Sequence, residues 1–127
     1  MADFGAGTLV SIITYAWEVY GKYADLGEQG SQLAADVRAM AEQLESSNVF
    51  LRSHNEKLSF RLKQRLLQAS RSCKITLEEA HRGVDDSKRK RSRTWMALFS
   101  PDNITALSTK LQRDRNELFG VNQDITL

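Results

Sequence analysis

The chain has 127 residues, 41% of them hydrophobic, and its 18 Lys and Arg against 16 Asp and Glu give a formal net charge of +2. Such a chain forms one ordinary domain whose core needs no disulfide or metal, and it is too apolar and too weakly charged for intrinsic disorder. One Cys and two His exclude an intrachain disulfide and a thiolate-rich zinc site. Because no secretory signal is visible ahead of the first apolar stretch, this cysteine usage predicts a cytoplasmic protein.

The first predicted helix covers about residues 8–24 and is apolar on two adjacent stripes. Positions spaced by three and four form a first stripe of Leu9, Ile12, Ala16, Val19 and Tyr23, and a second stripe of Val10, Ile13, Trp17, Tyr20 and Ala24. A helix this apolar is expected at the centre of a bundle or against lipid. It spans about 25 Å and contains Glu18, so it is too short and too polar for a lone transmembrane anchor across a bilayer core of about 30 Å.

Two further amphipathic segments follow a connection at residues 27–30. Ser31 is the predicted N-cap of the second helix, whose apolar seam contains one polar residue, Ser47. The third helix begins near Leu58 and keeps a 3–4 rhythm up to Gly83, a suitable residue to end it. Cys73 lies on its apolar stripe, where a buried thiol is expected.

The last helix is predicted to begin at Ser100-Pro101-Asp102, a sequence that caps and starts helices. Asp114 occupies one position of its heptad seam, and we expect it either to leave the core or to pair with an arginine of the third helix. One proline and long tracts without helix breakers favour helices over strands. The sequence therefore predicts an all-α fold, an antiparallel four-helix bundle with up-down-up-down topology, as a single domain over residues 1–127.

No catalytic, cofactor or metal site is predicted. His54 and His81 fall near predicted helix ends, and neither forms a nucleophile and base pair with Cys73. Gly5-Ala6-Gly7-Thr8 lacks the lysine and the preceding strand of a phosphate-binding loop. The acidic pairs are adjacent in sequence and would diverge on a helix. We therefore expect no enzymatic activity and no cofactor.

A basic run precedes the last helix and leaves three interpretations open. It can be a solvated loop, a contact to anionic lipids, or a nuclear import or nucleic-acid signal. The candidate lipid contacts are Lys88, Arg89, Lys90, Arg91 and Arg93. We expect no nucleic acid, because no stacking platform surrounds the run and many carboxylates balance it. Trp95, which follows the run, and Trp17 are both expected to pack in the core.

Several segments resemble the HeLo-like N-terminal domains of fungal NLR-like (STAND) proteins. The similar segments are Gly7 to Ile13 with Val19 to Tyr23, Leu33 to Leu44, Lys90-Arg91-Ser92-Arg93-Thr94-Trp95, Phe99, Asp102-Asn103-Ile104, Leu107 and Lys110-Leu111-Gln112. The resemblance is a pattern with a few anchors over nearly the whole chain, without an active-site motif. The acidic E-D-V-I-D motif of plant coiled-coil domains is absent, and Ala35-Asp36-Val37-Arg38 matches only a fragment of it.

The resemblance implies a four-helix bundle similar to the killer domain of the necroptosis pseudokinase and to plant immune-receptor coiled coils. It implies a cell-death effector excised from the N-terminus of a larger receptor, with self-association and the receptor's nucleotide-binding and repeat domains as partners. The first helix would then leave the bundle and enter the plasma membrane, to which the cytoplasmic protein would be recruited.

The physical basis of such a switch can be stated without the resemblance, from the apolar width of the first helix. Exposing its apolar face costs about 25 cal/mol per Å², whereas neighbouring copies or lipid would bury the face again. The predicted insertion and oligomerisation residues are Leu9, Val10, Ile12, Ile13, Ala16, Trp17, Glu18 and Val19, with Thr8, Ser11, Thr14 and Glu18 free to line a polar lumen. Two alternatives stay open: the helix remains in the core throughout, or the bundle is a non-enzymatic adaptor that self-associates or docks a partner away from membranes.

Overall fold

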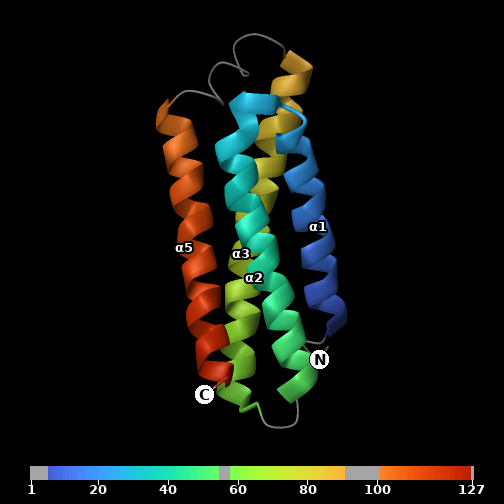
Figure 1. The fold of residues 1–127 in the computed structure, drawn as a ribbon, viewed down its shortest axis with the longest axis vertical. Coiled ribbons are helices and arrows are strands. Elements are labelled where there is room, and N and C mark those ends of the chain that lie inside the picture. Colours follow the sequence, from blue (N-terminus) through green and yellow to red (C-terminus); the bar gives the residue numbers. More distant parts are fainter. Residues whose placement is uncertain (1–5, 55–57, 91–100, 127) are drawn as a thin grey trace.

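The structure is a computed structural model that describes residues 6–54, 58–90 and 101–126, with the backbone alone at 6, 29, 86–90 and 101 (Figure 1). Four α-helices account for nearly all of it: α1 (Ala6–Ala24), α2 (Ser31–His54), α3 (Phe60–Lys90) and α5 (Pro101–Thr126), with a 3-10 turn, η1 (Gly27–Gly30), between the first two. The helices alternate in direction along the chain (Figure 1). The predicted all-α four-helix bundle is thereby confirmed.

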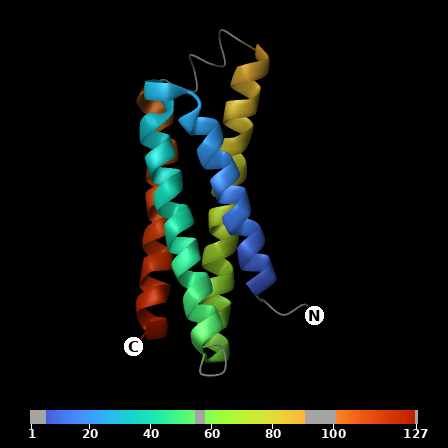
Figure 2. The same ribbon diagram turned by 45° about the vertical axis from the view of Figure 1, so that its right-hand side comes forward.

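The helices follow one another around the bundle in the order α1, α2, α5, α3 (Figures 1 and 2). Each of α1 and α5 packs against both α2 and α3, while α2 and α3 face each other across one diagonal. The neighbours α1 and α3 therefore run parallel, as do α2 and α5, and the antiparallel neighbours are the pairs α1–α2 and α3–α5. Hydrophobic periodicity predicts the seam of each helix but not this order.

The connection between α1 and α2 is tight and depends on two glycines. Gly27 has a φ of 69°, in the left-handed region that favours glycine. A side chain at Gly30 would meet the backbone oxygen of Tyr23, since an added Cβ would lie 2.2 Å from it. Ser31 is not the predicted N-cap: it is already helical, and its hydroxyl donates back to the Glu28 carbonyl at 2.9 Å because η1 leads directly into α2.

The third helix is longer than the sequence predicts. It continues through Gly83 to Lys90, and Ser59 caps its start by accepting a hydrogen bond from the Leu62 N–H at 3.2 Å. The predicted end at Gly83 is wrong because the apolar seam resumes at once: Val84 is fully buried. Residues 84–90, which lie beyond the predicted end of this helix, are therefore helical.

The core is one apolar cluster along the bundle axis to which all four helices contribute. From α1 it takes the first stripe, and from α3 it takes Cys73, which is buried as expected. The seams of α2 and α5 also bury polar residues, among them Ser47 and Asp114. The core thus combines apolar packing with contacts between buried polar groups. The buried seam of α1 is apolar apart from one tyrosine hydroxyl, whereas the seams of α2 and α5 include polar side chains.

Candidate functional site

The two apolar stripes of α1 have different surroundings. All of the first stripe is buried: Leu9, Ala16, Val19 and Tyr23 are 0% exposed and Ile12 is 5% exposed. The second stripe lies at the edge of the core, with Ile13, Trp17 and Tyr20 half-buried and Val10 40% exposed. Trp17 therefore packs against the core without being enclosed by it, and the predicted insertion residues divide into a buried set and an accessible set.

The second stripe borders a groove between α1, η1 and α2. Trp17 and Tyr20 make an edge-to-face ring contact with centroids 5.5 Å apart. Tyr20 also lines the groove, which has a volume of about 320 Å³ and is bordered by Ala24, Gly27 and Arg38. Small side chains on α2 leave this space, so the second stripe is only partly covered.

The polar strip of α1 faces solvent rather than the core. Thr8, Ser11 and Glu18 are exposed, and the Thr14 hydroxyl donates to the Val10 carbonyl at 2.9 Å. Because these side chains are already solvated in the bundle, no buried hydrogen bond between them and another helix is broken when α1 moves.

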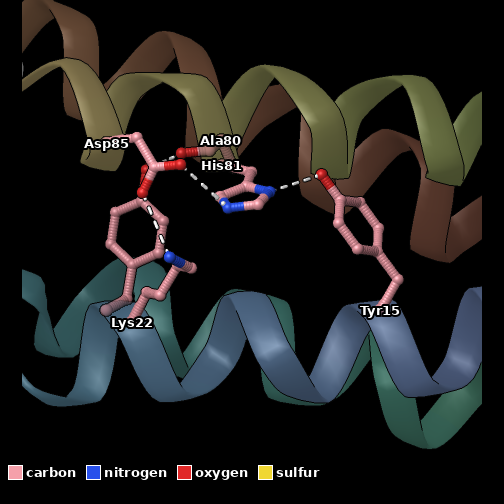
Figure 3. Close-up of polar contacts among 6 residues, drawn as sticks. Tyr15, Lys22, Ala80, His81 and Asp85 are labelled. Carbon is pink, nitrogen blue, oxygen red and sulfur yellow. Dashed lines mark hydrogen bonds and ion pairs between the residues drawn. The ribbon is translucent and has the colours of Figure 1, made fainter.

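A chain of polar contacts joins α1 to α3 (Figure 3). Lys22 Nζ and His81 Nε2 both lie 3.1 Å from the Asp85 carboxylate, one on each oxygen. An Nε2–H that donates to Asp85 leaves Nδ1 of neutral His81 as an acceptor, so the Tyr15 hydroxyl, 2.8 Å away, is the donor there. These four residues, Tyr15, Lys22, His81 and Asp85, are called the α1–α3 polar cluster below.

Two tyrosines of α1, Tyr15 and Tyr23, hold their protons more tightly than usual in this setting. Burial raises the pKa of Tyr15, as do the charges of Glu78, Glu18 and Asp85, with Arg82 opposing them. Burial likewise raises the pKa of Tyr23, whose hydroxyl donates to the Ala80 carbonyl at 2.8 Å. A raised pKa is the opposite of what an activated nucleophile needs. The Tyr15–His81–Asp85 arrangement is therefore suited to holding α1 against α3.

The α1–α3 polar cluster is absent from the residues proposed on sequence alone. His81 and Asp85 are separated by one helical turn, a spacing that brings two side chains together on a helix. That signal was concealed because the predicted third helix ended between them, at Gly83. Tyr15 lies 66 positions from His81, so only the packing of α1 beside α3 reveals its contact.

The fourth helix, α5, is held in the bundle by buried polar groups. Asp114 is 1% exposed and accepts hydrogen bonds from the hydroxyls of Ser72 at 3.0 Å and Thr76 at 2.5 Å, both on α3. Both expectations for Asp114 are wrong, because it stays in the core and its partners on α3 are hydroxyls. The nearest arginine, Arg113, belongs to α5 itself, with Nε at 3.8 Å.

Polar contacts also join α5 to α2. The Ser47 hydroxyl donates to Asn122 Oδ1 at 2.7 Å, and Asn122 Nδ2 donates to Gln43 Oε1 at 3.1 Å. Nearer the start of α5, the Ser108 hydroxyl donates to Asp36 at 2.6 Å. Ser47, the polar exception in the predicted α2 seam, therefore has a partner on the neighbouring helix.

Cys73 lies beside the buried carboxylate of α5. Its pKa is raised mainly by burial and further by the charges of Asp114 and Glu117. A thiol with a raised pKa holds little thiolate, the reactive form, so Cys73 packs as a small apolar residue.

Two predicted features fall outside what the structure describes. Arg91, Arg93 and Trp95 lie beyond the described ranges, and so do the side chains of residues 88–90, so the predicted lipid contact is untested. Within the described ranges, no group of three or more His, Cys, Asp or Glu is arranged to hold a metal ion. The helices described also include none that is both long and apolar enough to cross a membrane.

Comparisons with protein-family models, curated proteins and solved structures found no match to this chain. The resemblance to HeLo-like domains therefore stays a prediction that depends on the quoted residues.

Proposed function

We propose that this chain is a non-enzymatic signalling bundle whose first helix, α1, changes partners on activation. In this proposal it is the N-terminal effector domain of a receptor of the NLR-like type that its sequence resembles. In the cytoplasm, the receptor's nucleotide-binding and repeat domains would bring several of these bundles together. The clustered α1 helices would then bury their apolar faces in one another and in the plasma membrane, causing cell death.

One observation carries the proposal: the stripe that α1 buries is apolar except for the Tyr23 hydroxyl. Apolar burial is non-directional, so neighbouring copies or lipid can replace the core as a dry environment. The same transfer of α5 would leave Asp114 and Asn122 buried without their partners, which costs several kcal/mol. Of these two helices, α1 therefore loses less stabilising free energy when it moves from the core to another apolar environment, because it breaks fewer buried hydrogen bonds.

The half-exposed second stripe supports the same role. Val10, Ile13 and Trp17 give α1 apolar surface that a neighbouring copy could cover before the first stripe is exposed. The α1–α3 polar cluster lies at the rim of the bundle, where Lys22 and Asp85 remain 29% and 41% exposed. Water can therefore take over these contacts when α1 leaves.

The test is leakage of dye from anionic liposomes as the concentration of purified protein rises. Val10→Glu places a charge on the second stripe without entering the core, whereas Ile12→Glu would unfold the bundle because Ile12 is buried. Val49→Glu is the matched control, since Val49 is an exposed valine on α2. We expect Val10→Glu to abolish most of the leakage and Val49→Glu to leave it intact, with equal helical content in both.

Intact liposomes at every concentration of the wild-type protein would refute the membrane role, as would equal leakage from both variants. The second candidate function is an adaptor that docks or self-associates without touching lipid. The complete burial of the first stripe and the contacts of the α1–α3 polar cluster favour this candidate. Concentration-dependent oligomers in analytical ultracentrifugation, with no leakage, would support it.

A further inference from the structure

Charge is distributed unevenly along this nearly neutral chain. Residues 46–77 hold seven of the 18 basic residues and one of the 16 acidic residues, so the rest of the chain is net acidic. The seven basic residues are Arg52, Lys57, Arg61, Lys63, Arg65, Arg71 and Lys74, and the acidic one is Glu56. The net charge of +2 therefore conceals a strongly basic segment that covers the end of α2 and the first half of α3.

The first half of α3 also exposes apolar side chains on its outward side. Phe60 and Ile75 are 74% and 63% exposed, more than any other large hydrophobic side chain in the described ranges. They share one exposed side of α3 with basic and amide residues. This surface, called the α3 outer face, consists of Phe60, Arg61, Gln68, Arg71, Lys74 and Ile75.

The cations of the α3 outer face are available to a partner. Arg65, at the edge of α3, is paired with Asp124 on α5 at 2.6 Å. By contrast, no carboxylate among the described residues makes an ion pair with Arg61, Arg71 or Lys74. The described part of α3 reaches its first carboxylate only at Glu78. Three accessible cations and two exposed apolar side chains thus share the part of α3 that precedes its first carboxylate, Glu78.

We propose that the α3 outer face docks the bundle onto an anionic membrane surface. This inference rests on the proposed function, for which it supplies the site of lipid contact. Arg and Lys attract acidic headgroups while their alkyl stems accompany apolar neighbours into the interface. Phe60 and Ile75 lie about 22 Å apart along α3, so the helix would rest along the membrane plane with both side chains in the headgroup region.

The composition of the face favours lipid over nucleic acid. Binding of single strands uses several aromatic side chains on which successive bases stack, and the described residues of the face include one such ring, that of Phe60. An interfacial helix instead combines cations with Phe, Leu or Ile on one surface. Docking through α3 would also bring its parallel neighbour α1 beside the membrane, because α1 and α3 begin at the same end of the bundle (Figures 1 and 2).

The test is co-sedimentation of the full chain with vesicles of phosphatidylcholine alone, or containing about one third phosphatidylserine. Arg71→Gln/Lys74→Gln removes two cations from the face. The matched control, Arg38→Gln/Arg52→Gln, removes two exposed cations from α2, which lies diagonally across the bundle. Since each cation near an anionic surface contributes roughly fivefold, we expect the first variant to bind anionic vesicles about 30-fold more weakly and the control to change far less.

A second pair of variants tests the apolar part of the face. Ile75→Ser should weaken binding several-fold and Val49→Ser, at a similarly exposed site on α2, should leave it unchanged. An equal loss of vesicle affinity in each variant and its matched control would overturn the proposal, because binding would then not depend on this face. Binding to a short DNA duplex without binding to vesicles would overturn it too, and so would no binding at all.

The outcomes separate this inference from the proposed function. Anionic vesicles that bind the chain through the face but do not leak would refute the α1 insertion and leave the docking surface in place. Leakage that persists undiminished in Arg71→Gln/Lys74→Gln, with undiminished binding, would refute the docking surface and leave α1 insertion in place.

Discussion

The helices α1 and α5 lie at opposite corners of the bundle and pack against the same two neighbours, yet they are held differently. Between α5 and its neighbours, the buried or half-buried hydrogen bonds of Ser108, Asp114 and Asn122 stand among the apolar contacts. The buried surface of α1 is almost entirely apolar, and most of its polar contacts with α3 lie at the rim.

The difference bears on which helix can move. A buried hydrogen bond is directional, so it fixes the register of two helices, and its loss leaves a desolvated group without a partner. Apolar packing has no such requirement, and another apolar environment of suitable shape can replace it. We infer that α5 with its neighbours is the fixed part of the bundle and α1 the exchangeable part.

The largest effect on stability is expected from a substitution that removes a buried polar contact of α5. Asp114→Ala leaves the hydroxyls of Ser72 and Thr76 buried without their acceptor, and we expect it to lower the free energy of unfolding by about 2–3 kcal/mol. Urea denaturation followed by circular dichroism measures the change. Asn116→Ala, at an exposed position of the same helix, is the control and should cost under about 0.5 kcal/mol. A loss as small as the control's would show that Asp114 does not secure α5.

The sequence predicts the apolar seam of each helix better than it predicts which helices those seams pack against. The seams of all four helices follow from the 3–4 spacing of apolar residues, because amphipathic periodicity is a local property. The same spacing yields both stripes of α1 but does not say that the first is buried and the second half-exposed. That outcome depends on the place of α1 between α2 and α3.

The errors concern contacts between segments distant in sequence. Asp114 is conspicuous among the apolar residues of its seam, yet its partners are Ser72 and Thr76 because α5, rather than α1, packs on that side of α3. Gly83 resembles a helix end, and the packing of Val84 in the core outweighs the low helix propensity of glycine. Since the helix continues, Asp85 reaches Lys22 and His81, and the α1–α3 polar cluster forms.

A smaller effect tests whether α1 opens separately. Tyr15→Phe removes the hydroxyl that contacts His81 and keeps the ring, so α1 should lose about 1 kcal/mol of its attachment to α3. Amide hydrogen exchange of α1 should become roughly fivefold faster, while exchange in α5 stays unchanged. The control is Tyr20→Phe, because the described residues offer the Tyr20 hydroxyl no hydrogen-bond partner. Equal acceleration in α1 and α5 would mean that the bundle opens as one unit, and the contrast between the two helices would fail.

The smallest effect concerns alkaline pH and the attachment of α1. Burial, followed by the charges of Glu78, Glu18 and Asp85, raises the pKa of Tyr15 above its ordinary value of 10.0. The folded state therefore holds this proton more tightly than the unfolded state does. Its contribution to stability is complete below pH 10 and is lost as the pH rises through the folded pKa.

We therefore expect the free energy of unfolding to fall as the pH rises above about 10, and to fall less steeply in Tyr15→Phe than in the wild type. Tyr23 and Cys73, whose pKa values are also raised by burial, contribute a loss of the same sign to both proteins. The difference between the two urea titration series thus isolates Tyr15. Parallel pH profiles would show that the Tyr15 hydroxyl does not attach α1 to α3, and the attachment would then depend on apolar contact and on Lys22 with Asp85.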